Sequence, residues 1–375
     1  MSRFPRPLLA LLVSLLLAGC APVPPAEPPA PTAALEPPPA PEPQPEPEPE
    51  PPPAVRLAFV GDILPGGSLA GLVARRGPDY PWQHVAPLLQ QADLAIGNLE
   101  TAVSTRGAAE PDKQFTFRSH PDTVGGAARA GIDVLSLANN HSLDYGPEAL
   151  LDTIAHLREA GIHPVGAGGD LAEAARPVVI EVRGIRLAFL AFSRVIPATH
   201  WVAWEGHPGT APGWDPKVVL DATRKARQEA DHVILLLHWG EERHDEPRPA
   251  DVALARQLLE NGATLVIGHH PHVLQRIDWR GDRLVAYSLG NFIFPGVPRR
   301  LNQETGILQV TLDQAGVTAA HFTPFYITEG QPRPVEADAE RRIMERLHRL
   351  SRRCGTQVAP DGALTPASGD PKPDC

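Results

Sequence analysis

Between residues 55 and 330 the chain alternates short apolar runs with longer amphipathic stretches. The apolar runs have the length of strands and are bounded by polar or turn-forming residues, so we predict that each is a buried strand. They lie at residues 56–60, 94–96, 134–137, 186–190, 232–237, 264–267 and 284–287. Strands that alternate with helical patterns are typical of an α/β layered domain, and we expect that fold class here.

The amphipathic stretches predict three helices between these strands and a fourth near the C-terminus. They lie at residues 147–160, 216–230, 249–261 and 337–353. The first three open on proline, whose missing amide proton is harmless in a first helical turn. Gly161 and Gly262 fit C-terminal caps. Two β-rich runs around Arg183-Gly184 predict a hairpin, and residues 306–312 and 317–322 predict two later strands.

Residues 1–19 have the pattern of a bacterial secretion signal, with a basic start and an apolar run over 8–18 that is too short to span a bilayer. The tetrapeptide Leu17-Ala18-Gly19-Cys20 resembles the lipobox of bacterial lipoproteins. We therefore expect lipidation of Cys20 and attachment to a membrane through that lipid. Ala21 is not the aspartate that retains lipoproteins at the inner membrane. The expected location is the cell envelope, at the outer membrane and facing the periplasm, in a host that has an outer membrane.

Residues 20–54 form a tether made largely of proline, alanine and glutamate. It lacks the apolar side chains needed to offset the entropy of ordering, and successive prolines favour an extended polyproline II conformation. At about 3.1 Å per residue, the tether could reach on the order of 100 Å from the membrane. A disordered spacer is the simplest interpretation, and a docking site for a proline-binding domain is the alternative. Cys354 and Cys375 remain after the anchor, and an oxidising compartment would permit, without requiring, their pairing.

Charge limits the classes of partner. The chain carries a formal net charge of -10 at pH 7. Two arginines before Cys20 and six glutamates in the tether account for -4 of it, so residues 55–375 carry -6. A mildly acidic domain does not favour nucleic acid, and we expect no nucleic-acid partner. An anionic polymer would be repelled at long range, so an acidic substrate would need a local cationic site, which a metal ion could supply.

Polar side chains collect where the predicted strands end. In chain order, these ends carry Asp62, Asn98 with Glu100, Asn139-Asn140-His141, His238 and His269-His270-Pro271-His272. An open α/β sheet binds its ligands at this edge. Each short block, taken alone, has a simpler explanation as a turn or a helix cap. Three imidazoles crowded into one turn are costly to charge together, however, and they suit metal ligation.

The mixture of carboxylate, amide and imidazole groups predicts a site for one or two divalent metal ions. Mn, Zn or Fe fits better than Ca, which prefers oxygen ligands alone. Such an ion would polarise a phosphoryl or carbonyl oxygen and would lower the pKa of bound water. The sequence offers no serine or cysteine nucleophile motif that would take over this role.

Six blocks of the sequence, in order along the chain, resemble the signature blocks of the poly-γ-glutamate capsule-biosynthesis (CapA) family. They are Gly61-Asp62, Gly97-Asn98-Leu99-Glu100-Thr101, residues 136–146, His238-Trp239-Gly240-Glu241-Glu242, Gly268-His269-His270-Pro271-His272 and residues 287–292. This family is related to the calcineurin-like metallophosphoesterases, whose Gly-Asn-His block resembles Asn139-Asn140-His141. The resemblance implies a metallophosphoesterase-like α/β fold, a two-sheet β-sandwich flanked by helices, over residues 55–330. A C-terminal helix and tail over residues 331–375 would follow it.

The resemblance also implies roles for individual residues. The positions of metal ligands fall at Asp62, Asn140, His238, His270 and His272, and the histidine that stabilises charge on the transferred group falls at His141. Two positions depart from the metallophosphoesterase pattern. Leu64 replaces the histidine of the first block, and the bridging aspartate of the second block falls at Asn98. A neutral amide bridges two cations poorly, so a second ion would depend on Glu100.

Further residues are expected to support the site. Asp144 is a candidate either for positioning the helix after the histidine loop or for orienting His141 and so contributing to catalysis. Arg118 is a candidate for binding a substrate anion. The remaining candidates for contact with a substrate are His269, Ser288 and Asn291. A tight turn at Gly290 explains the last block equally well.

Two functions are consistent with these patterns. The first is a metal-dependent enzyme, a hydrolase or transferase of metallophosphoesterase type, in the biosynthesis or processing of a capsule or poly-γ-glutamate-type polymer. Its substrate would be an acidic extracellular polymer or a phosphoester, and a membrane synthase complex is a candidate partner. The second is a non-catalytic accessory protein that binds or guides an extracellular acidic polymer. The strand-end residues favour the first function, and the two departures from the metal-binding pattern favour the second.

Overall fold

The computed structural model describes residues 23–28, 53–296 and 299–366. Residues 23–28 are exposed and form no helix or strand. The predicted signal over residues 1–19, the lipidation site Cys20 and most of the tether lie outside the described residues, so they stay predictions. Among the helices of the described ranges, none has the length and apolar character needed to cross a membrane.

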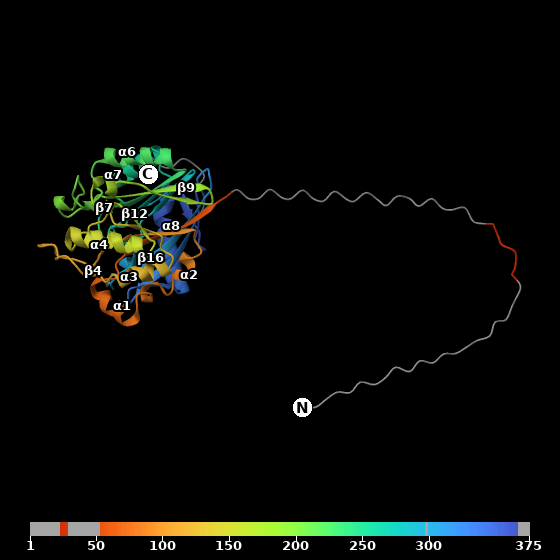
Figure 1. Ribbon diagram of the computed structural model, residues 1–375, viewed down its shortest axis with the longest axis horizontal. Coiled ribbons are helices and arrows are strands. Elements are labelled where there is room, and N and C mark those ends of the chain that lie inside the picture. Colours follow the sequence, from red (N-terminus) through yellow and green to blue (C-terminus); the bar gives the residue numbers. More distant parts are fainter. Residues whose placement is uncertain (1–22, 29–52, 297–298, 367–375) are drawn as a thin grey trace, which may run out of the picture. The chain divides into compact units, whose positions relative to one another are not determined.

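Two large β-sheets form the framework of the chain from residue 53 onward (Figure 1). The first sheet contains β1 (Val55–Ile63), β2 (Leu94–Leu99), β5 (Val134–Ser136), β6 (His163–Val165), β15 (Asn291–Ile293), β16 (Glu304–Leu312), β17 (Val317–Thr328), β18 (Gln331–Pro334), β19 (Thr356–Val358) and β20 (Ala363–Pro366). The second contains β8 (Val178–Val182), β9 (Ile185–Ser193), β11 (His232–His238), β12 (Leu265–His269), β13 (Ile277–Arg280) and β14 (Arg283–Ala286). Two short pairs are separate: β3 (Ala102–Val103) with β4 (Arg118–Ser119), and β7 (Ala167–Gly168) with β10 (Gly209–Thr210).

Each sheet is built around a group of parallel strands. The first sheet has the order β19-β20-β17-β16-β1-β2-β5-β6, in which β1, β2, β5 and β6 are parallel. The second has the order β13-β14-β12-β11-β9-β8, in which β9, β11, β12 and β14 are parallel. Every strand predicted from the apolar runs is present. The register places Asp62 beside Asn98 and His238 beside His269, so the strand-end residues of each sheet share one edge.

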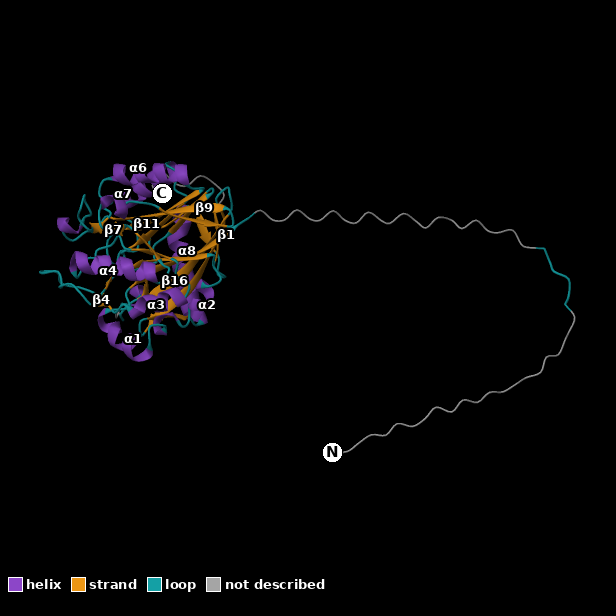
Figure 2. Cartoon of the chain, in the orientation of Figure 1, coloured by secondary structure: helices purple, strands orange, loops and turns teal. Residues whose placement is uncertain are grey.

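The helices of the described residues are α1 (Ala70–Arg76), α2 (Ala86–Leu89), α3 (Asp122–Arg129), α4 (Gly146–Glu159), α5 (Leu171–Ala174), α6 (Pro216–Glu229), α7 (Pro249–Glu260) and α8 (Ala337–Ser351). Helices α1 to α4, α6 and α7 lie on the outer faces of the two sheets (Figure 2). One apolar cluster lies between the sheets and joins residues of both, such as Phe59 and Phe189. A second cluster packs α1 to α4 against the first sheet, and a third packs α6 and α7 against the second. The predicted two-sheet β-sandwich flanked by helices is therefore confirmed.

The described residues after 330 continue this sandwich. Strands β18 and β20 pair with β17, and β19 pairs with β20. Helix α8 places Ile343 and Leu347 in the cluster between the sheets. The segment that we set apart as a C-terminal helix and tail is thus continuous with the first sheet as far as residue 366. Cys354 is buried and disulfide-bonded, whereas Cys375 lies outside the described residues, so the pairing of these two cysteines stays a prediction.

Local sequence explains several elements directly. The hairpin between β8 and β9 turns at Arg183 and Gly184, whose φ angles are 52° and 78°. Two consecutive left-handed residues are the geometry of a tight hairpin turn, in which glycine carries no steric cost. Helices α4, α6 and α7 begin with proline in the first turn, as predicted. Helices α1, α2 and α3 were not predicted, because their apolar faces are short and they are defined by packing on β1 and β2.

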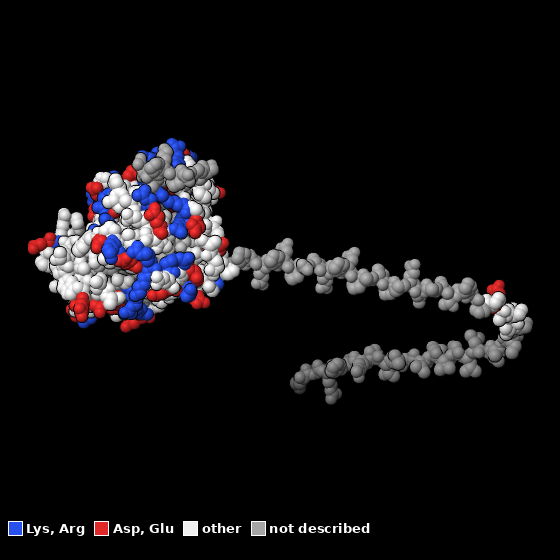
Figure 3. All heavy atoms as spheres, turned by 90° about the horizontal axis from the view of Figure 1, so that it is seen from above, with Lys and Arg blue, Asp and Glu red and all other residues white. Residues whose placement is uncertain are grey.

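Charges of both signs are distributed over the surface. On the face seen in Figure 3, Lys and Arg side chains lie among Asp and Glu side chains. Ion pairs of this kind occur on α6, where Lys217 and Arg224 both contact Asp221. Exposed pairs of this type typically contribute about 0–1 kcal/mol each, so the sandwich is stabilised mainly by its apolar clusters.

Gly268 is expected to be essential for the close approach of two strands near the strand-end residues. A Cβ at Gly268 would lie 1.9 Å from the carbonyl oxygen of Tyr287 and 2.3 Å from Nε1 of Trp239. We predict that Gly268→Ala lowers the free energy of unfolding by roughly 1–3 kcal/mol, because the strands must move apart. Urea denaturation measures this change. The control Gly71→Ala, in α1, meets only the flexible end of Arg75 at 3.5 Å and should cause no loss of stability; equal losses in both variants would contradict the explanation.

Candidate metal centre

The predicted strand-end residues meet where the carboxyl edges of the two sheets come together. The backbone amide of His270 donates to Oδ2 of Asp62 at 3.3 Å, which joins the second sheet to the first. Nε2 of His238 lies 2.8 Å from Oδ1 of Asn140, which makes a second connection between the sheets. Both carboxylate and imidazole groups are therefore present in one buried place, although their sequence positions span more than half of the chain.

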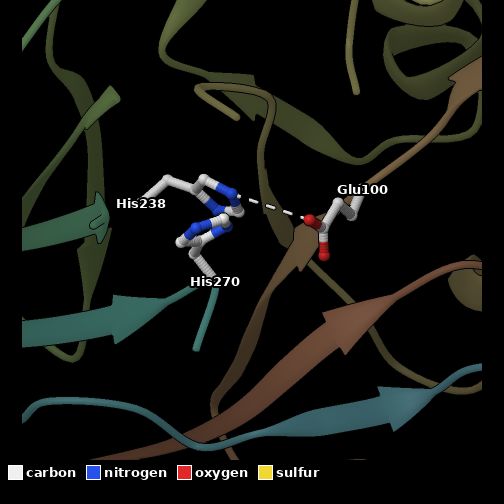
Figure 4. Close-up of side chains that lie close together, drawn as sticks. All are labelled: Glu100, His238 and His270. Atoms are coloured by element: carbon white, nitrogen blue, oxygen red, sulfur yellow. Dashed lines mark ion pairs between the residues drawn. The ribbon is translucent and has the colours of Figure 1, made fainter. Parts of the chain in front are cut away.

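Glu100 is the most unusual group in this place. Its side chain is fully buried, and neither carboxylate oxygen has a hydrogen-bond partner among the described residues. Oε1 lies 3.6 Å from Nε2 of His238 and 3.9 Å from Nε2 of His272, and Figure 4 shows it facing the imidazoles of His238 and His270. Burial, followed by repulsion from Asp62, raises the pKa of Glu100 well above its ordinary value. A buried carboxylate without a donor is costly, and a bound cation would remove that cost.

The three imidazoles differ in their electrostatic state. Burial lowers the pKa of His238 well below its ordinary value, and the nearby imidazoles, His270 first, lower it further. Burial lowers the pKa of His270 to about 3, and its Nδ1 has no hydrogen-bond partner among the described residues. Burial also opposes the charged form of His272, but Glu100 and Asp62 outweigh it and raise the pKa to about 9. His238 and His270 are therefore neutral and can offer nitrogen lone pairs, which is the state that metal ligation requires.

The spacing of these groups fits a divalent ion. Two triads share the buried Glu100: one adds His238 and His270, and the other adds Asp62 and His272, with the ligand atoms of each within 4.8 Å of one another. Ligands that bind one ion at about 2.0–2.2 Å are at most about 4.4 Å apart, so small side-chain movements would complete the coordination. The donor set of carboxylate oxygen and imidazole nitrogen suits Mn, Zn or Fe. The residues present therefore fit the predicted metal ion.

The carboxamide of Asn98 is already occupied by hydrogen bonds to neighbouring side chains. Its Nδ2 donates to Oδ1 of Asp62 at 2.9 Å, and its Oδ1 accepts from Nδ2 of Asn139 at 3.0 Å. The amide thus holds the carboxylate of Asp62 in place through a chain of hydrogen bonds. Ligation of a metal by Asn98 would require its carboxamide to exchange these partners, and its predicted role as a ligand stays a prediction.

His141 and Asp144 form a pair at the side of the centre. Nδ1 of His141 lies 2.7 Å from Oδ2 of Asp144, which also accepts from the backbone amide of Phe117 at 2.6 Å. Burial lowers the pKa of His141, although Asp144 opposes this. The pair belongs to none of the groups that could hold a metal ion among the described residues. Its geometry agrees with the predicted orienting role of Asp144, which no further observation tests.

Lys113 contacts both residues of this pair, and its place in the site was not predicted from the sequence. Its Nζ donates to Oδ1 of Asp144 and to the carbonyl oxygen of Asn140, the latter at 2.6 Å, and it lies 3.0 Å from Nδ1 of His141. Its ammonium also lies 4.8 Å from the centre of the Trp201 ring. Burial lowers the pKa of Lys113 despite the nearby carboxylates. A lysine in an irregular loop between two short strands gives no local signal of this role, because its partners are about 30 residues away.

The residues predicted to contact a substrate lie in different surroundings. Arg118 stacks on the ring of Tyr145, with 4.1 Å between the guanidinium carbon and the ring centre, and remains exposed. Nε2 of His269 lies 3.2 Å from the carbonyl oxygen of Val60, so this imidazole faces the backbone of β1. Two of the buried candidates make hydrogen bonds within the loop: Asn291 through Oδ1 to Nδ1 of His272 at 2.9 Å, and Ser288 through Oγ to the amide of Gly290 at 3.1 Å. Their roles in substrate binding stay predictions.

Comparison with known proteins places this arrangement in context. The family model described as "Bacterial capsule synthesis protein PGA_cap" matches residues 56–296. The capsule biosynthesis protein CapA of Bacillus anthracis is 36% identical over 286 residues, which cover 74% of this chain and 69% of that protein. The PGA biosynthesis protein CapA of Bacillus subtilis is 31% identical over 284 residues, which cover 75% of this chain and 74% of that protein. A solved structure, a putative 5′-nucleotidase from Staphylococcus aureus, matches at 14% identity with a TM-score of 0.47, over 76% of this chain and 55% of that one. The family match includes every residue of the metal centre from Asp62 to His272.

Proposed function

Since the chain belongs to the PGA_cap family of bacterial capsule synthesis proteins, we propose that it is a metal-dependent enzyme that acts in the biosynthesis or processing of a capsule or poly-γ-glutamate-type polymer. The observation that carries this proposal is the buried, unpartnered carboxylate of Glu100 beside neutral imidazoles. A purely structural pocket would have no reason to retain such a group, because a buried ionisable side chain without a partner destabilises the folded state.

The residues that would hold the metal are Asp62, Glu100, Asn140, His238, His270 and His272. A divalent ion bound there would supply a Lewis acid and a means of activating water. The two triads share Glu100, so this carboxylate would contribute to binding at either group of ligands. Asn98, in the position of the usual bridging aspartate, would instead orient Asp62. Mn, Zn and Fe all remain suitable for this donor set.

His141 would exchange a proton with the reacting group. Asp144 holds its Nδ1 at 2.7 Å, which leaves Nε2 available for the substrate. Lys113 fixes Asp144 from the opposite oxygen, so the orientation of the imidazole is set by two buried charges. A phosphoester or an amide bond of an acidic polymer could be the bond broken, since both develop negative charge on oxygen that cationic groups stabilise.

The proposed setting is the cell envelope. Lipid on Cys20 would attach the protein to a membrane, at the outer membrane if the host has one, and the proline-rich tether would allow the domain to reach a growing polymer. An acidic polymer would be held by local positive charge, to which bound ions and the exposed Arg118 would contribute. A membrane synthase complex is the proposed partner in this setting.

Turnover by the Mn²⁺-loaded domain tests this function. We expect hydrolysis or transfer with a panel of phosphoesters and γ-glutamyl polymers, and a loss of rate of about 10²–10⁴-fold in His141→Ala with unchanged Mn²⁺ content. The control His156→Ala, on α4 beside Glu159, should keep the wild-type rate. Polymer binding without turnover of any substrate would contradict the proposed enzymatic function and would support the accessory function. Turnover that His141→Ala leaves intact would contradict the role of His141.

A further inference from the structure

The loop after β11 is fastened to the histidine loop after β12. The backbone amide of Arg243 donates to the carbonyl oxygen of Pro271 at 2.8 Å, and Nε2 of Gln275 donates to the carbonyl oxygen of His244 at 2.8 Å. Gly240, with φ of 89°, brings its backbone so close that a Cβ there would lie 3.0 Å from Cγ of Pro271. These contacts fix the position of the intervening residues, Glu241 and Glu242, relative to the metal centre.

Glu242 reaches the centre from the solvent side. A carboxylate oxygen of Glu242 and one ring nitrogen each of His270 and His272 lie within 4.8 Å of one another. Glu242 is exposed, whereas His270 is buried. The side chain of Glu242 takes part in none of the ion pairs found among the described residues, so its charge is not neutralised by a lysine or an arginine there.

His270 supplies an independent sign that the centre can accept a ligand. Its Nδ1 is buried and has no hydrogen-bond partner among the described residues. Its backbone has φ of 96°, which is costly for a residue with a side chain and is maintained by the hydrogen bond from its amide to Asp62. Strained backbone and an unpartnered nitrogen thus occur in the residue that shares one ligand group with Glu100 and another with Glu242.

We propose that Glu242 is a further metal ligand, which closes the coordination sphere at His270 and His272 from the solvent side. This inference rests on the proposed metal centre and assigns to it a carboxylate that the sequence blocks alone did not identify as a ligand. Because Glu242 is the exposed member of the three ligand groups found among the described residues, it is the ligand past which an ion must enter and leave. It would therefore control both the affinity of the ion that it contacts and the rate at which that ion is lost.

Titration of the metal-free chain with Mn²⁺ tests this inference without any need for a substrate. We expect Glu242→Gln to weaken the binding of one Mn²⁺ by about tenfold or more and to accelerate its removal by a chelator to a similar extent. The matched control is Glu241→Gln, which removes the neighbouring exposed carboxylate, 3.6 Å from Nδ1 of His244. That control should keep wild-type affinity and wild-type release.

The possible outcomes separate this inference from the proposed function. If wild-type protein binds Mn²⁺ and Glu242→Gln binds and releases it identically, Glu242 is not a ligand and the proposed centre stands. If Glu241→Gln and Glu242→Gln weaken binding equally, the effect is general surface charge, and the assignment of Glu242 is overturned. If wild-type protein binds no Mn²⁺, Zn²⁺ or Fe²⁺, the proposed metal centre itself is wrong.

Discussion

Glu100→Gln is expected to lower the affinity of the protein for Mn²⁺ by at least about 100-fold, because it removes the charge that both triads share. Glutamine has nearly the same volume as glutamate, so the packing around this buried position should be retained. The metal-free variant should be at least as stable as the metal-free wild type, since a buried carboxylate without a hydrogen-bond partner is replaced by a neutral amide. Calorimetric titration measures the affinity, and urea denaturation of the metal-free proteins measures the stability.

The control for this prediction is Glu173→Gln. Glu173 is a partly buried carboxylate on α5 that pairs with Arg158 at 2.7 Å, and it belongs to none of the ligand groups in the described part of the chain. The Glu173→Gln variant should bind Mn²⁺ with the affinity of the wild type. An unchanged affinity in Glu100→Gln would remove the central support for the metal centre, whereas a loss in both variants would indicate a general effect of charge.

Lys113→Met is expected to have the largest effect on stability, with a loss of about 3–5 kcal/mol in the free energy of unfolding. The side chain of Lys113 is 13% exposed and that of its partner Asp144 is fully buried, so the substitution leaves a buried carboxylate without its cation. The contact of the ammonium with the ring of Trp201 is lost as well. Urea denaturation of the metal-free protein at neutral pH gives the value directly.

An exposed lysine provides the comparison. Lys217 pairs with Asp221 at 2.7 Å on α6, but its side chain is 79% exposed, so Lys217→Met should change stability by less than about 1 kcal/mol. Comparable small changes in the two variants would mean that Asp144 does not depend on Lys113 for its charge. The proposed orientation of His141 by two buried charges would then be wrong.

The sequence could predict that the metal ligands lie close together, because these residues lie at or just after the ends of parallel strands. Asp62 and Asn98 lie near the ends of β1 and β2, and His238 ends β11, so the topology of each sheet brings its polar residues to one edge. Glu100 follows the last residue of β2, only two residues after Asn98, where an aspartate is the usual residue, so its carboxylate remains at the same edge of the sheet. The departure from the usual pattern therefore moves the charge by two residues without removing it.

The parts that could not be anticipated depend on contacts between distant residues. Lys113 lies in a loop without regular structure, and only the folded chain shows that it meets Asp144. The block His238-Trp239-Gly240-Glu241-Glu242 contains two neighbouring glutamates, and nothing local distinguishes the one that faces His270. The first sheet also contains β16 and β17, and β1 pairs with β16 across about 250 residues of intervening sequence. Such pairings have no signature in the pattern of apolar positions near either strand.

Diffraction from crystals grown with Mn²⁺, recorded at the manganese absorption edge, tests the central claim most directly. The proposed centre predicts anomalous peaks on both sides of Glu100, one within bonding distance of His238 and His270 and the other within bonding distance of Asp62 and His272. A single peak at one of these positions would retain the metal site and reject a second ion. Manganese bound only elsewhere, with Glu100 still buried and unpartnered, would contradict the account.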